Sequence, residues 1–272
     1  MSKADVVAGL AADLAEEAAS LMEIVGSISE AQWALPTPAP TWTIHDQIAH
    51  LANFDALTRL ALDSPDEFAR FRDSLPDLQE YVDGVGPANA GLTGAQKLDW
   101  WRRENECLAA AIAAAEPDVR VPWFGPPMSL PSKITARIME TWAHGQDVAD
   151  TLGVVRIPTA RLRHVSRIGV LAFANSFRAQ GLPTPDVPVF VELTAPDGDD
   201  VWSWGEKSGA DSVRGAALDF CLVVTQRRHL ADTDLQVSGA VAEEWMSIAQ
   251  AFAGPPGRRR RPGQFTVATP LG

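Results

Sequence analysis

The sequence lacks several features that would assign it to a familiar class of protein. It has only two cysteines, Cys107 and Cys221, and neither has a cysteine or histidine neighbour at metal-binding spacing. This excludes a zinc ribbon, and we expect both to be buried, reduced core residues. There is no apolar run long enough to span a membrane. Phosphate-binding loops of the G-x-G-x-x-G or G-x-x-x-x-G-K-[S/T] type and the G-x-S-x-G nucleophile elbow are also absent.

Positive charge is scarce. The chain has 23 Lys and Arg against 35 Asp and Glu, a net charge of -12, which argues against nucleic-acid binding by the folded body. The N-terminal segment carries acidic residues where a signal peptide needs an apolar core. We therefore expect a cytoplasmic protein with no membrane association and a small-molecule substrate as its partner. A homodimer is a possible assembly.

The first half of the chain predicts four long helices. Apolar residues recur every three or four positions in each of them. The second and third begin with capping-box sequences at Thr43 and Thr93. We expect Ser132 to cap the fourth and Gly153 to end it in a left-handed turn. Such helices suit a bundle, in which sites are built from inward-pointing polar side chains. The four predicted helices are residues 3–28, 43–62, 93–115 and 134–153.

Two connections in this half have more than one interpretation. Residues 64–92 hold one short predicted helix and a glycine-rich segment. This whole connection is either a pocket wall or lid, or a variable excursion without function. The loop 121–132 is rich in proline and carries Trp123 and Phe124. It forms either the rim of a pocket or a cover over the core.

After Gly153 the pattern changes to α+β. A helix over residues 159–180 is followed by two strands, 187–193 and 201–204, joined by a turn. A third short strand, a helix over 216–229, a further strand or turn and a helix over 240–252 complete this part. We predict a mainly α protein with a bundle at 1–155, a smaller α+β domain at 156–254 and a disordered basic tail at 255–272, whose arginines are solvated.

The fourth helix carries a candidate metal site. Glu140 and His144 lie four residues apart, so both project from one face of the helix. A carboxylate and an imidazole at this spacing can bind one divalent metal. A solvated ion pair is the alternative. Asp147 shares the face and is a candidate partner of a ligand or a further ligand.

The second helix supplies three more candidates. Asp55 lies on its buried row, and a buried carboxylate needs hydrogen-bond donors or a metal. His50 lies with Phe54 on an adjoining apolar strip, which points it inward as a ligand or as a satisfied core histidine. His45 lies on the other flank. We regard Asp55 and His45 as candidates for orienting a ligand or moving a proton.

These motifs together resemble a known family. The segment from Trp42 to Leu51 fits W-T-[IV]-x-D-x-[IL]-x-H-L, and Glu140 with His144 fits E-x-x-x-H. The combination is similar to the DinB-like metal-binding four-helix bundles, in the actinobacterial branch typified by mycothiol-dependent maleylpyruvate isomerase. The segments 139–153, 218–229 and 239–257 look like an uncharacterised actinobacterial metal-binding family within it. The C-terminal half also resembles a domain associated with wyosine-base-forming proteins, but the cysteine cluster of an iron–sulfur radical enzyme is absent.

The resemblance implies a ligand set and a chemistry. His50, Glu140 and His144 would hold a divalent metal, commonly zinc, with an open position for water. A low-molecular-weight thiol, mycothiol, would bind there and become a thiolate that attacks a small electrophile. The resemblance thus implies a thiol transferase or isomerase. Nothing in the sequence specifies maleylpyruvate, so a hydrolase or lyase using metal-bound water and a non-catalytic binding protein stay open as alternatives.

Overall fold

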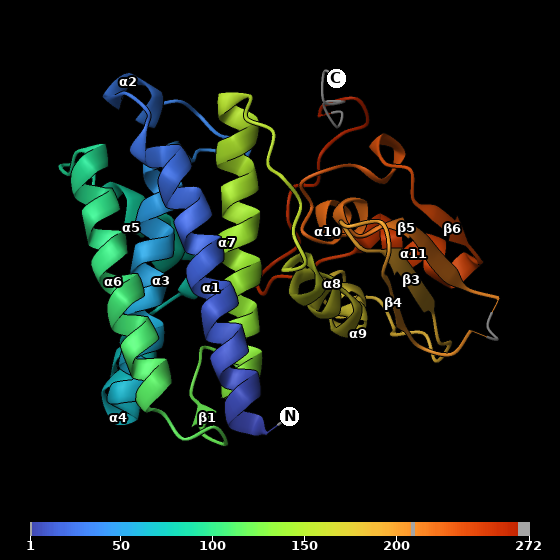
Figure 1. The fold of residues 1–272 in the computed structure, drawn as a ribbon, viewed down its shortest axis with the longest axis horizontal. Helices are drawn as coiled ribbons and strands as arrows, with labels where there is room; N and C mark the ends of the chain where they lie inside the picture. The colour runs from blue at the N-terminus through green and yellow to red at the C-terminus, as the bar shows by residue number, and fades with distance from the viewer. Residues whose placement is uncertain (1, 208–209, 266–272) are drawn as a thin grey trace. The chain divides into compact units, whose positions relative to one another are not determined.

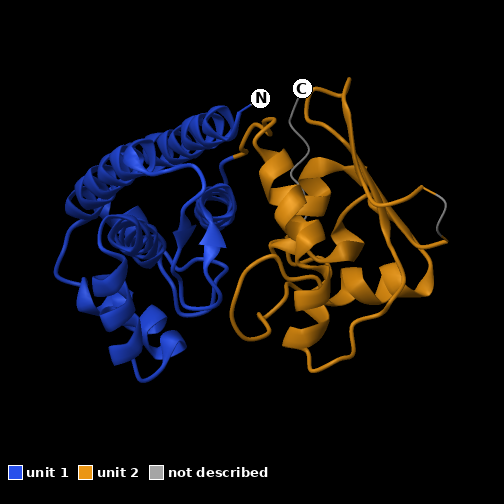
Figure 2. Cartoon of the chain, turned by 90° about the horizontal axis from the view of Figure 1, so that it is seen from below, with its two compact units in different colours: residues 1–154 blue, residues 155–272 orange. Residues whose placement is uncertain are grey.

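The structure, a computed structural model, describes residues 2–207 and 210–265. Contacts divide the chain into two compact units, residues 1–154 and 155–272, which are coloured separately in Figure 2. The boundary lies one residue from the predicted junction. We describe each unit by itself.

Four long helices make up most of the first unit (Figure 1). The helix α1 packs against α6 and α7, and α3 packs against the same two helices. The four therefore close a ring around an apolar core, and the predicted mainly α bundle is confirmed. The four helices are α1 Lys3–Gly26, α3 Ile44–Asp63, α6 Gly94–Ala114 and α7 Leu130–Leu152.

The helix ends follow the capping residues closely, with one exception. Thr43 and Thr93 each form a capping box, and Gly153 ends α7 with a φ of 67°. The prediction that α7 begins at Ile134 was wrong, because Ser129 caps it and Ser132 lies in its first turn. A proline is tolerated in the first turn of a helix, where its missing N–H would have no partner.

The two ambiguous connections now have definite structures. Residues 64–92 form two helices, α4 Pro65–Ser74 and α5 Leu78–Ala88, where one was predicted. Both pack against α3. The loop 121–132 covers the core, because Trp123 stacks on Phe68 with ring centroids 5.4 Å apart and Phe124 packs against the same cluster. The remaining short elements are α2 Glu30–Trp33, β1 Arg120–Val121 and β2 Met128–Ser129.

The second unit is α+β, as predicted. Its strands form a mixed sheet in the order β4-β3-β5-β6, in which only β3 and β5 run parallel. The predicted helix over 159–180 is interrupted at Ala172 and forms two helices. The helices are α8 Leu162–Leu171, α9 Phe173–Ala179, α10 Ala217–Val224, the 3₁₀ helix η1 Leu230–Asp232 and α11 Ala240–Ile248. The strands are β3 Phe190–Thr194, β4 Val201–Trp204, β5 Ser212–Ala216 and β6 Gln236–Ser238.

Two expectations about side-chain exposure need correction. Cys107 is exposed on α6, whereas Cys221 is buried as expected. Part of the predicted disordered tail makes defined contacts, because the backbone N–H of Gly263 donates to the Asp232 carboxylate and Arg260 is only 7% exposed. Residues 266–272 of that tail lie outside the described residues. A run of arginines thus gave no signal that one of them packs against Phe265.

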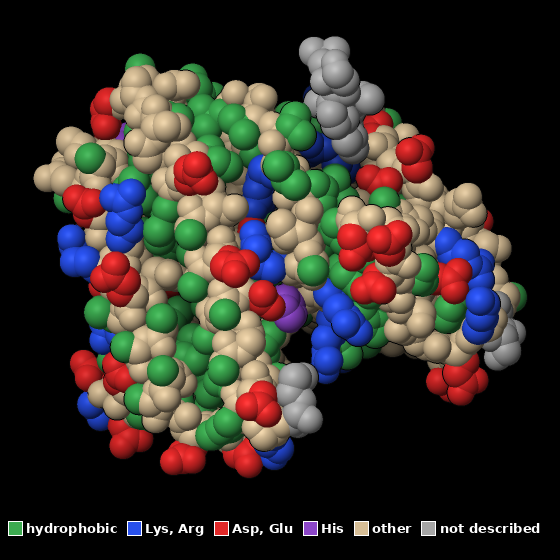
Figure 3. All heavy atoms as spheres, viewed as in Figure 1, with side chains coloured by type: hydrophobic (Ala, Val, Ile, Leu, Met, Phe, Trp, Pro, Cys, Tyr) green, Lys and Arg blue, Asp and Glu red, His purple; other side chains and the backbone are tan. Residues whose placement is uncertain are grey.

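The apolar character of the helices and the distribution of surface charge can be compared with what membrane or nucleic-acid partners require. No helix in the described part of the chain combines the length and apolar character needed to cross a membrane. On the face of the bundle seen in Figure 3, acidic and basic side chains are interspersed. This distribution provides no basic patch on that face for a nucleic-acid backbone.

A buried ion pair joins three of the bundle helices. The Nε of Arg137 on α7 donates to Asp55 Oδ1 on α3 over 2.9 Å, and both side chains are almost fully buried. The other oxygen accepts from the indole N–H of Trp101 on α6 at 2.9 Å and from Asn105 at 3.4 Å. Arg137 also donates to the carbonyl of Leu51. The carboxylate therefore has donors on both oxygens, as a buried charge requires.

We predict that Arg137→Ala lowers the free energy of unfolding by about 3–5 kcal/mol, because it leaves the Asp55 charge buried without its cation. Denaturant unfolding followed by circular dichroism measures the change. The matched control is Arg102→Ala, which removes an exposed ion pair with Asp99 and costs about 0–1 kcal/mol. Equal losses in the two variants would contradict the assignment.

Candidate metal centre

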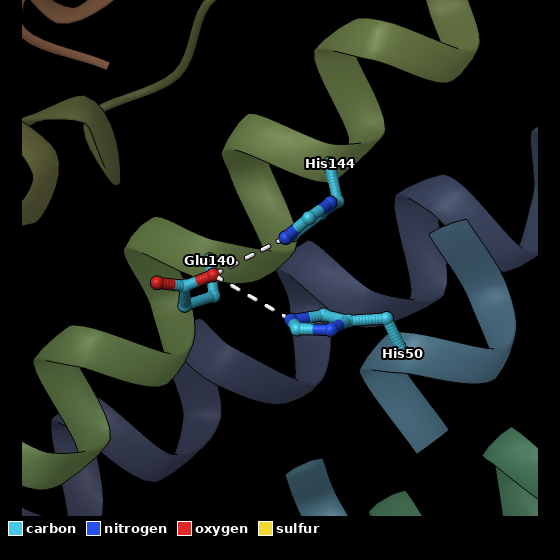
Figure 4. A group of neighbouring side chains, drawn as sticks. All are labelled: His50, Glu140 and His144. Atoms are coloured by element: carbon cyan, nitrogen blue, oxygen red, sulfur yellow. Dashed lines mark hydrogen bonds and ion pairs between the residues drawn. The ribbon is translucent and has the colours of Figure 1, made fainter. Parts of the chain in front are cut away.

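Three side chains from two helices converge on one point of the bundle. His50 comes from α3, and Glu140 and His144 come from α7 (Figure 4). The Oε2 atom of Glu140 lies 3.2 Å from His144 Nε2 and 3.9 Å from His50 Nε2. One ligand atom of each residue lies within 4.8 Å of the others. The structure thus brings together the three residues predicted as metal ligands.

The local sequence explains this convergence. Glu140 and His144 share a face of α7 because they are four residues apart. Arg137 is on the same helix, three residues before Glu140, and its bonds to Asp55 and Leu51 hold α7 against α3 close to His50. The ion pair therefore fixes the relative position of the two helices that carry the ligands.

A residue that the sequence analysis missed orients His144. Gln47 is fully buried on α3 and its Oε1 accepts a hydrogen bond from His144 Nδ1. The direction follows from the other end of the amide, where Gln47 Nε2 donates to Thr37 Oγ1 at 2.9 Å. Because Nδ1 carries the hydrogen, Nε2 is the nitrogen available to a metal. The available signal was the spacing of Gln47, three residues before His50 on the same helix.

Aromatic rings enclose both histidines. Trp42 stacks on His144 with centroids 5.6 Å apart and lies 5.1 Å from the ring of His50, which also contacts Phe54 at 4.4 Å. The proline-rich loop before α3 positions Trp42, whose carbonyl accepts hydrogen bonds from the N–H and the hydroxyl of Thr37 at 2.7 and 2.8 Å. These apolar contacts restrict ring rotation and limit the access of water to the ligands.

The electrostatics favour an ionised carboxylate. Burial raises the pKa of Glu140, but the hydrogen bond and charge of His144, with the charges of His50 and Arg137, outweigh it and lower the pKa to about 2. Glu140 is therefore negative at neutral pH. Two imidazoles and one carboxylate form a donor set that suits zinc and related divalent ions. The residues present thus fit a divalent metal.

The other predicted site residues lie elsewhere in the bundle. Asp55 is held in the ion pair with Arg137 and is not part of the candidate ligand group. Asp147 is fully buried on α7 but also lies outside that group. The Nε2 of His45 is 3.3 Å from Glu30 Oε1, and its ring packs on Trp33.

A pocket of about 340 Å³ adjoins the centre. His50, Trp42 and His45 line it on the α3 side, and residues of α5 line it on the other. Burial lowers the pKa of His45, with a further contribution from the Lys97 charge. The connection over 64–92 therefore provides a pocket wall, one of the two roles considered for it.

Comparison with solved structures shows which fold the chain has. Two solved structures, a mycothiol-dependent maleylpyruvate isomerase and a histidine-to-alanine mutant of it, match with TM-scores of 0.57 and 0.58 at 15% and 13% identity. Each match covers 93% of this chain and 97% of the other. At this identity the likeness shows a shared fold, a bundle followed by a smaller domain.

Sequence relatives then give the family. Residues 14–149 match the family described as mycothiol maleylpyruvate isomerase N-terminal domain, and residues 185–237 match one described as wyosine base formation. Uncharacterized proteins from two Mycobacterium tuberculosis strains, CDC 1551 / Oshkosh and H37Rv, are 43% identical over 250 residues, 92% of this chain and 97% of theirs. The chain belongs to the mycothiol maleylpyruvate isomerase N-terminal domain family, which confirms the predicted DinB-like branch.

We predict that Gln47→Leu weakens metal binding about 10- to 100-fold, because His144 loses the bond that fixes its orientation. Competition with a chromophoric chelator measures the affinity. The control is Gln146→Leu, which removes an amide bonded to Asp150 on the same helix as His144 and leaves the affinity unchanged. Equal metal affinities for wild type and Gln47→Leu would contradict the role of Gln47 in orienting His144.

The low pKa of Glu140 predicts an acid-sensitive contribution to stability. A carboxyl whose pKa falls from 4.5 to about 2 on folding contributes stability that is fully present above about pH 4.5 and is lost as the pH falls toward 2. In the metal-free protein we expect Glu140→Gln to flatten the dependence of unfolding free energy on pH over this window, by on the order of 2 kcal/mol. Parallel curves for the two proteins would contradict the assignment.

Proposed function

We propose that this protein is a divalent-metal-dependent enzyme that uses mycothiol to act on a small electrophilic substrate. The observation that carries the proposal is the convergence of His50, Glu140 and His144 from two helices within 4.8 Å. We propose zinc as the metal, because two histidines and one glutamate are a known ligand set of catalytic zinc sites. Three protein ligands are typical of catalytic zinc sites, which keep a position for an exogenous ligand, whereas structural sites use four.

A bound metal supplies Lewis acidity, which lowers the pKa of a thiol so that the thiolate nucleophile exists at neutral pH. The remaining work is done by the chain itself. Gln47 presents Nε2 of His144 by holding a hydrogen on Nδ1. Glu140 stays ionised, and Trp42 and Phe54 exclude water from the histidine rings. His45, in the adjoining pocket, is the residue placed to exchange a proton with a bound molecule.

The choice of a thiol is supported by family membership and by the relatives named for mycothiol-dependent maleylpyruvate isomerase. The distance in sequence from those solved structures leaves the electrophile open. Addition of the thiolate to an activated double bond, or displacement of a leaving group, are the two reaction types that such a nucleophile performs.

We predict that the purified wild-type protein contains about one divalent metal per chain and that His144→Ala contains none, because two remaining ligands do not retain it. Elemental mass spectrometry measures the content. His229→Ala is the matched control, since that imidazole accepts a backbone hydrogen bond in the second unit and takes no part in the centre.

Activity then separates the reaction types. The metal-loaded wild type is expected to consume mycothiol when it is screened against small electrophiles, and His144→Ala is expected to lose this activity. Full turnover in His144→Ala would sink the proposal. Turnover of a substrate at the same rate with and without a thiol would indicate a hydrolase or lyase, and the absence of metal after incubation with zinc would indicate a binding protein.

A further inference from the structure

The pocket beside the candidate metal centre contains a cationic side chain that is not one of the candidate ligands. Lys97 comes from the first turns of α6 and is only 2% exposed, yet it lines the 340 Å³ pocket together with His45 and His50. Within the described residues, no acceptor lies within hydrogen-bonding or ion-pair distance of its ammonium group. The side chain is buried but lines the pocket, so the three ammonium donors can be satisfied from the pocket, by water or by an anionic group of a bound molecule.

The neighbouring carboxylates are already used by the backbone. Asp46 Oδ2 accepts from the N–H and the hydroxyl of Thr43 at 2.8 and 2.6 Å. Glu30 accepts from the N–H of Gly94 at 3.0 and 3.1 Å and lies against His45. Both acids act on Lys97 through space and favour its charged form, while burial lowers the pKa of Lys97. They cap helices and stabilise the cation without forming a direct bond to it.

The remaining walls limit what the pocket admits. Val82, Val85 and Pro87 give an apolar side. Two carboxylates also line the pocket, Asp46, which accepts from Thr43, and Asp83, which accepts from Gln79. The imidazole of His45 points Nε2 toward Glu30, and its Nδ1 is buried without a hydrogen-bond partner. Lys97 is the only cation among the lining residues. A pocket of this volume suits a small molecule that has one anionic end.

We propose that this pocket binds the carboxylate group of a small-molecule substrate and that the Lys97 ammonium is the group that recognises it. The rest of such a molecule lies along the apolar α5 side, with His50 at the same pocket. This inference rests on the proposed function only in calling the carboxylate compound a substrate. Binding itself depends on Lys97 and does not require the metal.

The test is calorimetric titration of metal-free protein with succinate, a small carboxylate that probes the site directly. We expect the wild type to bind with a dissociation constant below about 10 mM. We expect Lys97→Met to weaken binding about tenfold or more, because it removes a charged hydrogen-bond donor. Lys207→Met, which removes an exposed lysine near Glu192, is the control for net charge and should bind like the wild type.

A second measurement uses the wild type alone, in case Lys97→Met fails to fold. Acetic anhydride acetylates lysine amines, and tandem mass spectrometry reports each site. Succinate should protect Lys97 several-fold and leave Lys207 unprotected. Equal succinate affinity in wild type and a folded Lys97→Met, or no protection of Lys97, would overturn the inference.

The His144→Ala variant separates this inference from the proposed function. Retained succinate binding in a variant that holds no metal supports the Lys97 site by itself. A wild type that binds no metal even after incubation with zinc, but still binds succinate through Lys97, would contradict the proposed function and support the pocket assignment. If the wild type contains metal but Lys97→Met binds succinate as tightly as the wild type does, the pocket assignment is wrong and the proposed function is unaffected.

Discussion

The buried pair between Asp55 and Arg137 is the constraint on which the bundle depends. It connects α3, α6 and α7 at one level, and every oxygen of the carboxylate has a donor. A buried ion pair adds little net stability over an apolar contact, but it penalises arrangements in which the two charges do not meet. Here the favoured arrangement places α7 against α3 in the register that brings Glu140 to His50. The pair therefore contributes more to the geometry of the metal centre than to the stability of the fold.

Polar hydrogen bonds fix the orientation of one candidate ligand, and an aromatic ring covers both histidines. Gln47 fixes the ring of His144, and Thr37 fixes the amide of Gln47. Trp42 then covers both histidines. Thr41, just before it, has a φ of 70°, a conformation that costs a non-glycine residue on the order of 1–3 kcal/mol. The chain accepts this local strain where the loop turns to place the indole, and the packing around Trp42 compensates for it.

Much of this fold and centre could be predicted from the sequence. Helix periods, the caps at Thr43, Thr93 and Gly153, and the spacing of Glu140 and His144 are local properties that a single sequence displays. The spacing of Gln47 from His50 indicated that the two share a side of α3, but the bond from His144 to Gln47 and the pairing of Asp55 with Arg137 could not be predicted, because both depend on which helices are neighbours. Lys97 was missed for the same reason, since an isolated lysine near a helix start has the pattern of a surface residue. The start of α7 was missed because Pro131 was read as part of a loop.

The division of the ligands between α3 and α7 has a consequence for how the protein is made. His50 leaves the ribosome long before Glu140 and His144, and α7 is the last helix of the first unit to be synthesised. A nascent chain that has already formed α1, α3 and α6 still presents only His50 of the three candidate ligands. The candidate ligand set is therefore complete only after α7 has been synthesised and has packed against α3.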